Sequence, residues 1–314
     1  MYPSSVDIVI VNWNSGSFLF NCINSIKYSN NDSFRLNRIF IVDNASTDNS
    51  LQNVENFDLP IVIIRNETNV GFAKACNQGA KNSNADYLLF LNPDTQLFNN
   101  SLNEPIHFLN KIENKNIGIV GVQILNESNE ISRNCSRFLT PVRIIYMSLG
   151  LDKIFPKLFP PHFMLEWDHK NSRVVDQVMG SFFLVRRSLF EKLEGFDERF
   201  FVYFEDLDFS FRAFNHGYKS YYLSTAQIFH KGGGTSEKVK ADRLAYILHS
   251  KLLYCKKHFS KFSFLLISLT TIVIEPFVRI INVLISESIR NIPEIVNGYK
   301  KLLFKLYRNL FGSK

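Results

Sequence analysis

Five consecutive apolar side chains and an acidic turn stand at residues 87–94, Tyr87-Leu88-Leu89-Phe90-Leu91-Asn92-Pro93-Asp94. An apolar run without alternating polar residues is typical of a strand buried on both faces of a parallel sheet. Pro93 restricts the backbone after the run and would present Asp94 rigidly at the carboxyl end of the strand. Considered alone, these residues fit an ordinary Pro-Asp turn equally well.

Similar apolar runs flank this strand, and amphipathic segments separate them. The other predicted strands of the first half are Val6–Trp13, Ile39–Val42, Ile61–Ile64 and Ile117–Val122. The predicted helices are Phe18–Tyr28, Asn49–Phe57, Phe72–Ala80 and Ser101–Ile112. This alternation predicts an α/β fold with a Rossmann-like, mostly parallel sheet flanked by helices. Ligands of such sheets bind outside the carboxyl ends of the strands.

The second half of the chain begins irregularly. Prolines interrupt residues 127–171, where we expect a long loop over the mouth of the sheet. Regular structure is predicted to resume with a strand, two helices and a strand, at Val175–Arg186, Arg187–Leu193, Glu205–His216 and Lys219–Phe229. After about residue 238 the chain becomes helical, apolar and basic.

Polar motifs follow the first two strands. Asn12 and Asn14 close the first, and Asp43 and Asn44 close the second. A carboxylate and amides at neighbouring strand ends can bind a pyrimidine edge and a ribose, although an Asx turn with a helix cap explains them too. Further along, Gly71 opens a helix whose N–H groups could face a diphosphate, with Lys74 in the first turn.

Acidic residues gather in the aromatic-rich stretch 195–209. Glu205, Asp206 and Asp208 lie within four residues, beside several Phe and Tyr side chains. Burial among aromatic rings and like charges raises a carboxyl pKa, as suits a general base, whereas a solvated helix N-terminus is the alternative. Downstream, His230 ends a strand before three glycines and is a candidate metal ligand, with a loop that could close over phosphates.

Composition narrows the class of protein. Of 314 residues, 46% are hydrophobic and 21% charged, which allows a large core and excludes global disorder. The net charge of +7 suits an anionic partner such as nucleic acid, anionic lipid or a sugar nucleotide. No stripe of basic and aromatic residues supports nucleic acid. Cys22, Cys76, Cys135 and Cys255 form no CxxC pair, so we expect buried, reduced thiols in a cytoplasmic protein.

Taken in order, the motifs resemble the family 2 glycosyltransferases over residues 6–236, especially their bacterial rhamnosyltransferase-like branch. The resemblance implies a GT-A fold and inverting, metal-dependent transfer of a sugar from a nucleotide-diphosphate donor to an acceptor hydroxyl. The branch suggests dTDP-rhamnose as donor and a glycan or lipid-linked acceptor in cell-surface polysaccharide synthesis. The expected domains are a catalytic domain at 1–237, with a nucleotide half at about 1–123 and an acceptor half at about 124–237, and a helical extension at 238–314.

The resemblance also assigns roles to residues. Asp206 would be the catalytic base with Glu205 beside it, and Asp94 and His230 would hold Mg²⁺ or Mn²⁺ at the diphosphate. The donor side would comprise Asn12, Asn14, Asp43, Asn44, Asn69, Gly71, Lys74, Asn77 and Asn92.

One departure leaves a second function open. The Asp-x-Asp metal motif of the family is Asn92-Pro93-Asp94 here, a form that is common in the rhamnosyltransferase-like branch. The missing carboxylate leaves a non-catalytic sugar-nucleotide-binding relative as the alternative. A nicotinamide-dependent Rossmann enzyme is excluded, because no GxGxxG follows the first strand.

The C-terminal extension contains two long apolar stretches. Phe262–Ile274 is apolar over thirteen residues, Glu275-Pro276 should interrupt it, and Phe277–Ile285 resumes. A bilayer core needs about twenty residues, so we expect helices lying on the inner face of the cell membrane. The alternative is packing on the catalytic domain or on a second copy in a homodimer. The lysines and arginine expected to touch anionic headgroups are Lys251, Lys256, Lys257, Lys300, Lys301, Lys305 and Arg308. No cleaved signal peptide is expected.

Overall fold

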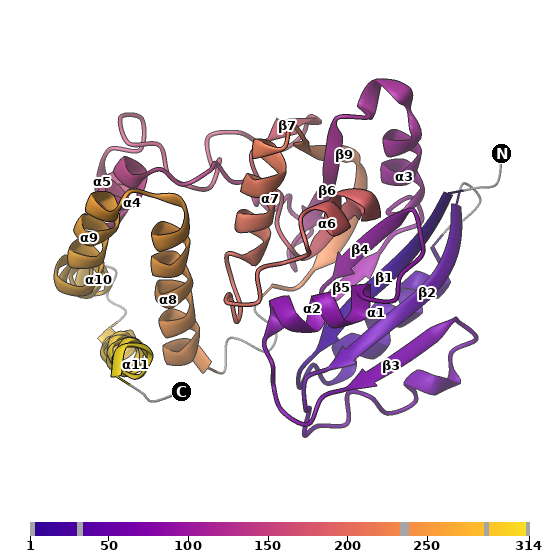
Figure 1. Ribbon diagram of the computed structural model, residues 1–314, viewed down its shortest axis with the longest axis horizontal. Coiled ribbons are helices and arrows are strands. Elements are labelled where there is room, and N and C mark those ends of the chain that lie inside the picture. The colour runs from indigo at the N-terminus through magenta and orange to yellow at the C-terminus, as the bar shows by residue number, and fades with distance from the viewer. Residues whose placement is uncertain (1–3, 30–33, 233–238, 286–288, 312–314) are drawn as a thin grey trace. The chain divides into compact units, whose positions relative to one another are not determined.

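The computed structural model describes residues 4–29, 34–232, 239–285 and 289–311, and Figure 1 shows their fold. Chain contacts define two compact units. The first, here called the sheet unit, comprises residues 1–138, 163–198 and 205–235. The second, the helical unit, comprises residues 139–162, 199–204 and 236–314.

The sheet unit is built on one mixed sheet of the described strands. They are β1 (Ser4–Asn12), β2 (Phe34–Asp43), β3 (Ile61–Arg65), β4 (Tyr87–Leu91), β5 (Thr95–Leu97), β6 (Ile117–Leu125), β7 (Arg173–Val175), β8 (Phe182–Arg186) and β9 (Lys219–His230). Their order is β3-β2-β1-β4-β8-β6-β9-β5, and β7 pairs with β9. The predicted α/β class with a helical C-terminal extension is confirmed.

Parallel pairing is concentrated in the first half of the sheet. The pairs β1–β2, β2–β3 and β1–β4 are parallel, whereas β8 joins β4 and β6 antiparallel. The chain runs from β1 outward to β3 and then crosses to β4 on the other side of β1. This reversal makes a topological switch point between β1 and β4, where α/β sheets bind ligands at the carboxyl ends.

Helices cover both faces of this sheet (Figure 1). They are α1 (Ser17–Lys27), α2 (Phe72–Ala80), α3 (Asn103–Asn110), α6 (Arg187–Lys192) and α7 (Glu205–Asn215). Because successive strand side chains point to opposite faces, Ile8 and Ile10 join one core with α1 and α3. Val9 and Val11 join the other core with α2, α6 and α7. Burial on both faces explains the continuous apolar runs, and each buried aliphatic side chain contributes about 1.5–3 kcal/mol.

Two predicted elements of the sheet unit are wrong. The helix expected at Asn49–Phe57 is only a 3₁₀ turn at Val54–Asn56, because Asn53 has a left-handed φ of 64° and Asp48 accepts from the Ser50 N–H. The strand expected at Val175–Arg186 is two strands, β7 and β8. The chain between them leaves the sheet, and the Gly180 N–H donates to Asp206 instead.

The irregular segment at 127–171 contains two helices that the prolines concealed. They are α4 (Pro141–Ser148) and α5 (Leu151–Ile154), both in the helical unit. Pro141 begins α4 instead of interrupting structure, since the first helical position needs no N–H donor. The Thr140 side chain caps this helix by accepting from the Arg143 N–H at 3.2 Å.

The C-terminal part of the helical unit contains the longest helices. They are α8 (Lys240–His258), α9 (Lys261–Leu269), a π-helical turn (Thr270–Ile274), α10 (Glu275–Ile285) and α11 (Ile292–Phe311). The predicted interruption at Glu275-Pro276 is wrong, because α9, the π turn and α10 form one helix, Lys261–Ile285. A π turn changes the hydrogen-bonding register and can accommodate the N–H that Pro276 lacks.

The helix Lys261–Ile285 has 25 residues and is long and apolar enough to cross a membrane by length and composition; 22% of its most apolar window is buried. Its inner face, however, carries a charged cluster. Glu275 is buried and accepts from Lys251 Nζ at 2.5 Å, from Arg279 Nη2 at 2.8 Å and from Ser148 Oγ at 3.1 Å. The expected headgroup contact by Lys251 is therefore wrong, because this ammonium is paired inside the unit.

Candidate active site

The carboxyl ends of β1 and β2 are joined by buried hydrogen bonds. Asn12 Nδ2 donates to Asp43 Oδ1 at 2.7 Å and to Ser50 Oγ at 2.8 Å, and the other Asp43 oxygen accepts from the Ser46 N–H at 3.2 Å. Asn14 Oδ1 accepts from the Thr47 N–H at 2.7 Å. The three residues predicted to contact the nucleoside, Asn12, Asn14 and Asp43, therefore belong to one connected edge. Asn44, predicted on the donor side, joins it because its N–H donates to the Asn12 carbonyl at 2.8 Å. In it, Asn12 orients the Asp43 carboxylate.

The loop before α2 adjoins this edge. Asn44 is buried, and its Nδ2 donates to the Gly71 carbonyl at 3.2 Å. Gly71 has a φ of 92°, which favours glycine, and its N–H donates to Asn69 Oδ1 at 3.0 Å. Lys74 is exposed in the first turn of α2. The N-terminus of α2 carries partial positive charge, and the exposed Lys74 ammonium lies beside it. Together they are suited to bind an anionic group such as a diphosphate.

Asn77 lies on α2, and its side chain hydrogen-bonds to a segment outside that helix. Its Oδ1 accepts from the Phe196 N–H at 2.9 Å, and its Nδ2 donates to the Phe196 carbonyl at 2.8 Å and to Glu198 at 3.1 Å. The side chain thus clamps the backbone at Phe196, on the segment that leads toward the acidic residues. This contact suggests that Asn77 supports the site by positioning that segment.

The predicted metal ligands come together from distant parts of the sequence. β5 pairs antiparallel with β9, so that Thr95 stands opposite His230. This register places Asp94 Oδ1 at 3.2 Å from His230 Nε2, with both side chains mostly buried. The Lys231 N–H donates to the Asp94 carbonyl at 3.2 Å, which fixes the turn further. Gly233 and Gly234, predicted to belong to a closing loop, lie outside the described residues.

The donor set fits a divalent cation that is shared with a ligand. Over the described ranges, no cluster of three or more His, Cys, Asp and Glu side chains is placed to hold a metal. A carboxylate and an imidazole suit Mn²⁺, and Mg²⁺ sites commonly use one or two carboxylates with substrate phosphates completing the shell. Asp94 and His230 therefore fit a site that is completed by the diphosphate.

The three acids at the start of α7 have different environments. Asp208 is fully buried and pairs with Arg212 Nε at 2.8 Å, so it is neutralised within the fold. Glu205 is buried, and its Oε2 has no hydrogen-bond partner among the described residues. Asp206 is partly exposed and accepts from the Gly180 N–H at 3.0 Å. Of the three, only Asp206 combines accessibility with a fixed carboxylate.

The electrostatics support this difference. Burial raises the pKa of Glu205 well above its ordinary value, and the neighbouring Asp206 and Asp208 carboxylates raise it further. Burial also raises the pKa of Asp206, although hydrogen bonds from Leu207, Gln177 and Gly180 oppose the shift. A partly exposed carboxylate with a raised pKa is a stronger base than an ordinary aspartate.

Three residues near Asp206 were missed from the sequence. A Cβ atom at Gly180 would stand 3.1 Å from Asp206 Oδ2, so glycine permits the close approach of this carboxylate. Gln177 and Ser181 are buried, and Gln177 Oε1 and Ser181 Oγ have no hydrogen-bond partner among the described residues. Unpaired buried polar atoms cost about 1–3 kcal/mol each, so both are suited to bind a ligand. A glycine in the middle of a predicted strand can mark a break, so Gly180 could have indicated this site. The single strand predicted at Val175–Arg186 passed over it.

The backbone before α7 is strained. Tyr203 and Phe204 have φ values of 66° and 72°, in the left-handed region that bulky residues rarely adopt. Such residues cost about 1–3 kcal/mol each and cluster at functional sites. This strain directly precedes Glu205 and Asp206, which agrees with a functional role for the acidic segment.

The four cysteines lie in the buried environments that were predicted for them. Cys22, Cys76, Cys135 and Cys255 are all free and buried. Burial raises the pKa of the Cys22 thiol to about 12, which keeps it protonated beside Thr95. The cysteines therefore contribute apolar packing.

Solved structures identify the fold class. A mannosyltransferase, PcManGT from Pyrobaculum calidifontis in complex with GDP-Man and Mn²⁺, has a TM-score of 0.56 at 15% identity, over 100% of this chain and 89% of that chain. GalNAc-T7 with UDP, GalNAc and Mn²⁺ has a TM-score of 0.55 at 17% identity, over 73% of this chain but only 43% of that longer chain. The chain therefore has the GT-A fold.

Sequence comparison identifies the family. The sequence profile described as "Glycosyl transferase family 2" matches residues 7–194, and one described as "Glycosyl transferase family group 2" matches residues 162–284. The chain belongs to glycosyl transferase family 2, and its resemblance is to the rhamnosyltransferase-like branch.

Two curated relatives illustrate that branch. N-acetylglucosaminyl-diphospho-decaprenol L-rhamnosyltransferase of Mycobacterium tuberculosis is 25% identical over 69% of this chain and 73% of its own length. Rhamnosyltransferase WbbL of Escherichia coli is 30% identical over 46% of this chain and 52% of its own length. The similarity to WbbL therefore spans about half of each protein.

Proposed function

We propose that this protein is an inverting, metal-dependent glycosyltransferase that transfers a hexose, with rhamnose from dTDP-rhamnose as the leading donor. The acceptor is a hydroxyl of a glycan or lipid-linked sugar in cell-surface polysaccharide synthesis. The family membership and the GT-A fold support the general activity. The resemblance to the rhamnosyltransferase-like branch supports the proposed donor, acceptor and stereochemistry.

One observation carries the proposal. The Asn92 N–H donates to the Ser181 carbonyl at 3.0 Å, and the adjacent Gly180 N–H donates to Asp206 Oδ2 at 3.0 Å. These two bonds connect the turn that carries Asp94 with the carboxylate of Asp206, the proposed general base. A ligand with its diphosphate at Asp94 could therefore present its sugar close to Asp206.

The mechanism is a single displacement. The acceptor hydroxyl gives its proton to Asp206 while its oxygen forms a bond to the anomeric carbon. The bond from that carbon to the diphosphate oxygen breaks, and the nucleoside diphosphate leaves with the electron pair. Attack from the face opposite to the leaving group inverts the anomeric centre. One carboxylate is sufficient, in contrast to the pair of carboxylates in a glycoside hydrolase.

The remaining residues bind and orient the donor. Asp43, held by Asn12, would accept from the pyrimidine edge, and Asn14 would contact the nucleoside beside it. Lys74 and the N-terminus of α2 would bind the diphosphate, with Asn69 and Asn44 fixing the Gly71 loop. Asp94 and His230 would hold Mg²⁺ or Mn²⁺, which supplies charge neutralisation for the departing diphosphate when bound.

A membrane-associated acceptor suits the helical unit. The mycobacterial relative is named for an acceptor linked to diphospho-decaprenol, and we propose a lipid-linked acceptor here on that basis. Exposed apolar side chains on the helix Lys261–Ile285 support binding at the inner face of the membrane. The buried Glu275–Lys251–Arg279 cluster on its inner face favours a helix that lies on the membrane over one surrounded by lipid. A homodimer formed through the same face is the competing use of this surface.

Calorimetry with the full-length protein tests the proposal. We expect dTDP-rhamnose to bind in the presence of Mn²⁺ more tightly than UDP-sugars, and binding to weaken when the metal is removed. Failure of every pyrimidine diphosphate to bind would contradict it. Donor binding without product formation from a lipid-linked acceptor would support the alternative, a non-catalytic relative.

A further inference from the structure

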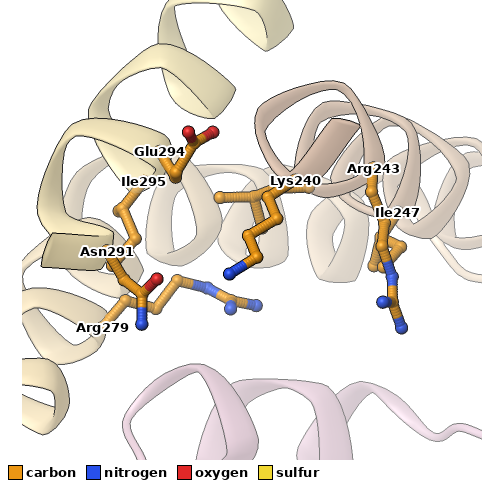
Figure 2. Close-up of a pocket in the computed structure, with 8 residues that line it drawn as sticks. Lys240, Arg243, Ile247, Arg279, Asn291, Glu294 and Ile295 are labelled. Atoms are coloured by element: carbon orange, nitrogen blue, oxygen red, sulfur yellow. The ribbon is translucent and has the colours of Figure 1, made fainter. Parts of the chain in front are cut away.

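A pocket lies within the helical unit, which contains none of the residues assigned to the candidate active site. Residues of α8, α10, α11 and the 3₁₀ turn Ile289–Asn291 line it, and it has a volume of about 760 Å³. The lining side chains are Lys240, Arg243, Leu244, Ile247, Arg279, Asn291, Glu294 and Ile295. Figure 2 shows them arranged around the pocket. This volume falls in the range of small-molecule sites, about 300–1,000 Å³.

The pocket has an excess of positive charge. Lys240 and Arg243 are exposed on α8 and form no ion pair with any other described residue. Arg279 on α10 is held by Glu275, which Lys251 also neutralises, so the guanidinium charge is only partly compensated. Glu294 is the one acid among the lining residues. The three cations outnumber it and come from two helices, which favours an anionic ligand.

Two helix N-termini add to this field. α8 begins at Lys240, and α11 begins at Ile292, so Arg243, Asn291, Glu294 and Ile295 all belong to the starting turns or their borders. These helices have 19 and 20 residues. The N-terminal end of such a helix carries about half a positive charge, which stabilises phosphate groups.

The surroundings indicate that the anion carries a hydrocarbon. Leu244, Ile247 and Ile295 form apolar walls between the cations. The same unit exposes large apolar side chains on α9 and α10, among them Phe262, Leu265, Leu269, Phe277, Ile281 and Ile285. A soluble phosphate compound would bind the cations but leave this apolar surface exposed to water. A lipid can contact both, through its phosphate and its hydrocarbon chains.

We propose that this pocket binds the phosphate or diphosphate headgroup of a membrane lipid, with Lys240, Arg243 and Arg279 as its ligands. The apolar side chains of α9 and α10 contact the acyl or polyprenyl chains. The site holds the enzyme at the membrane surface where a lipid-linked acceptor resides. The inference rests on the proposed function only for the identity of that acceptor, and its binding step is measured separately.

The test compares two double variants of the full-length protein. Lys240→Gln with Arg243→Gln removes two pocket cations. The matched control, Lys153→Gln with Lys157→Gln, removes two exposed cations of the helical unit that lie outside the pocket and outside the set expected to touch headgroups. Co-sedimentation is measured with phosphatidylcholine vesicles, alone and doped with phosphatidylglycerol or with a polyprenyl diphosphate.

We expect the wild type to prefer the doped vesicles, and the pocket variant to lose about tenfold or more of that affinity, since each basic residue near an anionic membrane contributes about 1 kcal/mol. The control variant should lose distinctly less. Equal losses in the two variants would overturn the proposal, because general surface charge would then explain binding.

Two further measurements separate the remaining outcomes. Calorimetry with inorganic pyrophosphate in metal-free buffer should show no difference between the wild type and the pocket variant; pyrophosphate binding that the pocket variant loses would make the site one for free phosphate and overturn the lipid assignment. Binding of dTDP-rhamnose with Mn²⁺ should be the same in the pocket variant and the wild type. Failure of nucleotide binding in both proteins, with the vesicle result intact, would refute the proposed function and leave the pocket proposal standing.

Discussion

The edge of the sheet and the face of the C-terminal helices differ in how they expose side chains. At the sheet edge, carboxylates and amides are buried or half-buried and bonded to one another, as Asn12 is to Asp43 and Gly180 is to Asp206. On the helix Lys261–Ile285, large apolar residues such as Phe277 and Ile281 are exposed, and the acid Glu275 is buried.

This contrast reflects two kinds of recognition. Chemistry on a sugar nucleotide requires charged groups that are already oriented and partly removed from water, because their interactions are then stronger and need little rearrangement. Binding to a membrane requires exposed hydrocarbon, and its strength scales with the apolar area that becomes buried. The polar network in the helical unit instead stabilises helix packing.

Removing the proposed base should have the largest effect. We expect Asp206→Asn to lower kcat about a thousandfold, since a positioned general base contributes about 10²–10⁴-fold. Donor binding should be retained, because the amide can still accept from the Gly180 N–H. Steady-state kinetics and calorimetry measure the two quantities.

The pH profile of the wild type supplies an independent check on Asp206. Because burial raises its pKa, kcat/KM should rise with pH through an acidic limb that lies above the ordinary aspartate pKa of about 3.9. An unchanged rate in Asp206→Asn would instead favour the non-catalytic alternative.

Loss of the metal carboxylate should have the next largest effect. Asp94→Asn should weaken Mn²⁺-dependent donor binding about a hundredfold, since few other protein ligands are available and cation affinity depends on carboxylate charge. His230→Gln should have a smaller effect, about tenfold. Calorimetric titration with and without Mn²⁺ measures both, and equal donor affinity in all three proteins would remove the metal from this site.

The exposed face of the helical unit should tolerate polar residues without unfolding. Phe277→Ser with Ile281→Ser should reduce vesicle affinity about thirtyfold, at about 1 kcal/mol for each half-exposed side chain that enters the membrane. Its melting temperature should stay close to that of the wild type.

Ile267→Ser is the matched comparison, because Ile267 lies on the same helix and is fully buried. It should lower thermal stability and leave the exposed face in place. If instead the Phe277/Ile281 variant changed from a dimer to a monomer with unaltered vesicle binding, the face would be a subunit interface.

The smallest effect concerns Glu205 and the stability of the sheet unit. Folded Glu205 keeps its proton to a higher pH than the unfolded chain does, because burial raises its pKa. The free energy of unfolding should therefore fall as pH rises from about 4.3 toward the raised pKa, by at most about 1.4 kcal/mol per pH unit. Glu205→Gln should abolish this slope and be more stable than the wild type at the alkaline end. Urea unfolding at several pH values measures this, and parallel slopes in the two proteins would show that Glu205 is ionised in the fold.

Much of the fold could be predicted because its signals are local. The strands at Tyr87–Leu91 and Ile117–Val122 appear as apolar runs, since both faces of each are buried. The grouping of the polar residues at strand ends could be predicted from the sequence, because parallel strands bring their carboxyl ends to one edge. Asp94 and His230 are close together as a metal pair requires, and their roles with the other assigned site residues remain predictions.

Other features depend on contacts between residues far apart in the chain. The resemblance assigns the base to Asp206, but the sequence does not show the different surroundings of the three acids. The Gly180 N–H donates to Asp206, Arg212 neutralises Asp208, and Glu205 is buried with its Oε2 unpaired among the described residues. Pro141 begins a helix and Pro276 lies within one, because capping and a π turn accommodate them.

Local sequence therefore determines where strands run and where polar groups gather, through burial patterns that repeat every two or four residues. Tertiary structure decides which acid is accessible, which lysine is paired, and that Lys240, Arg243 and Arg279 surround one pocket. The reason is physical: exposure, hydrogen bonding and pKa are set by neighbours that only the folded chain brings together.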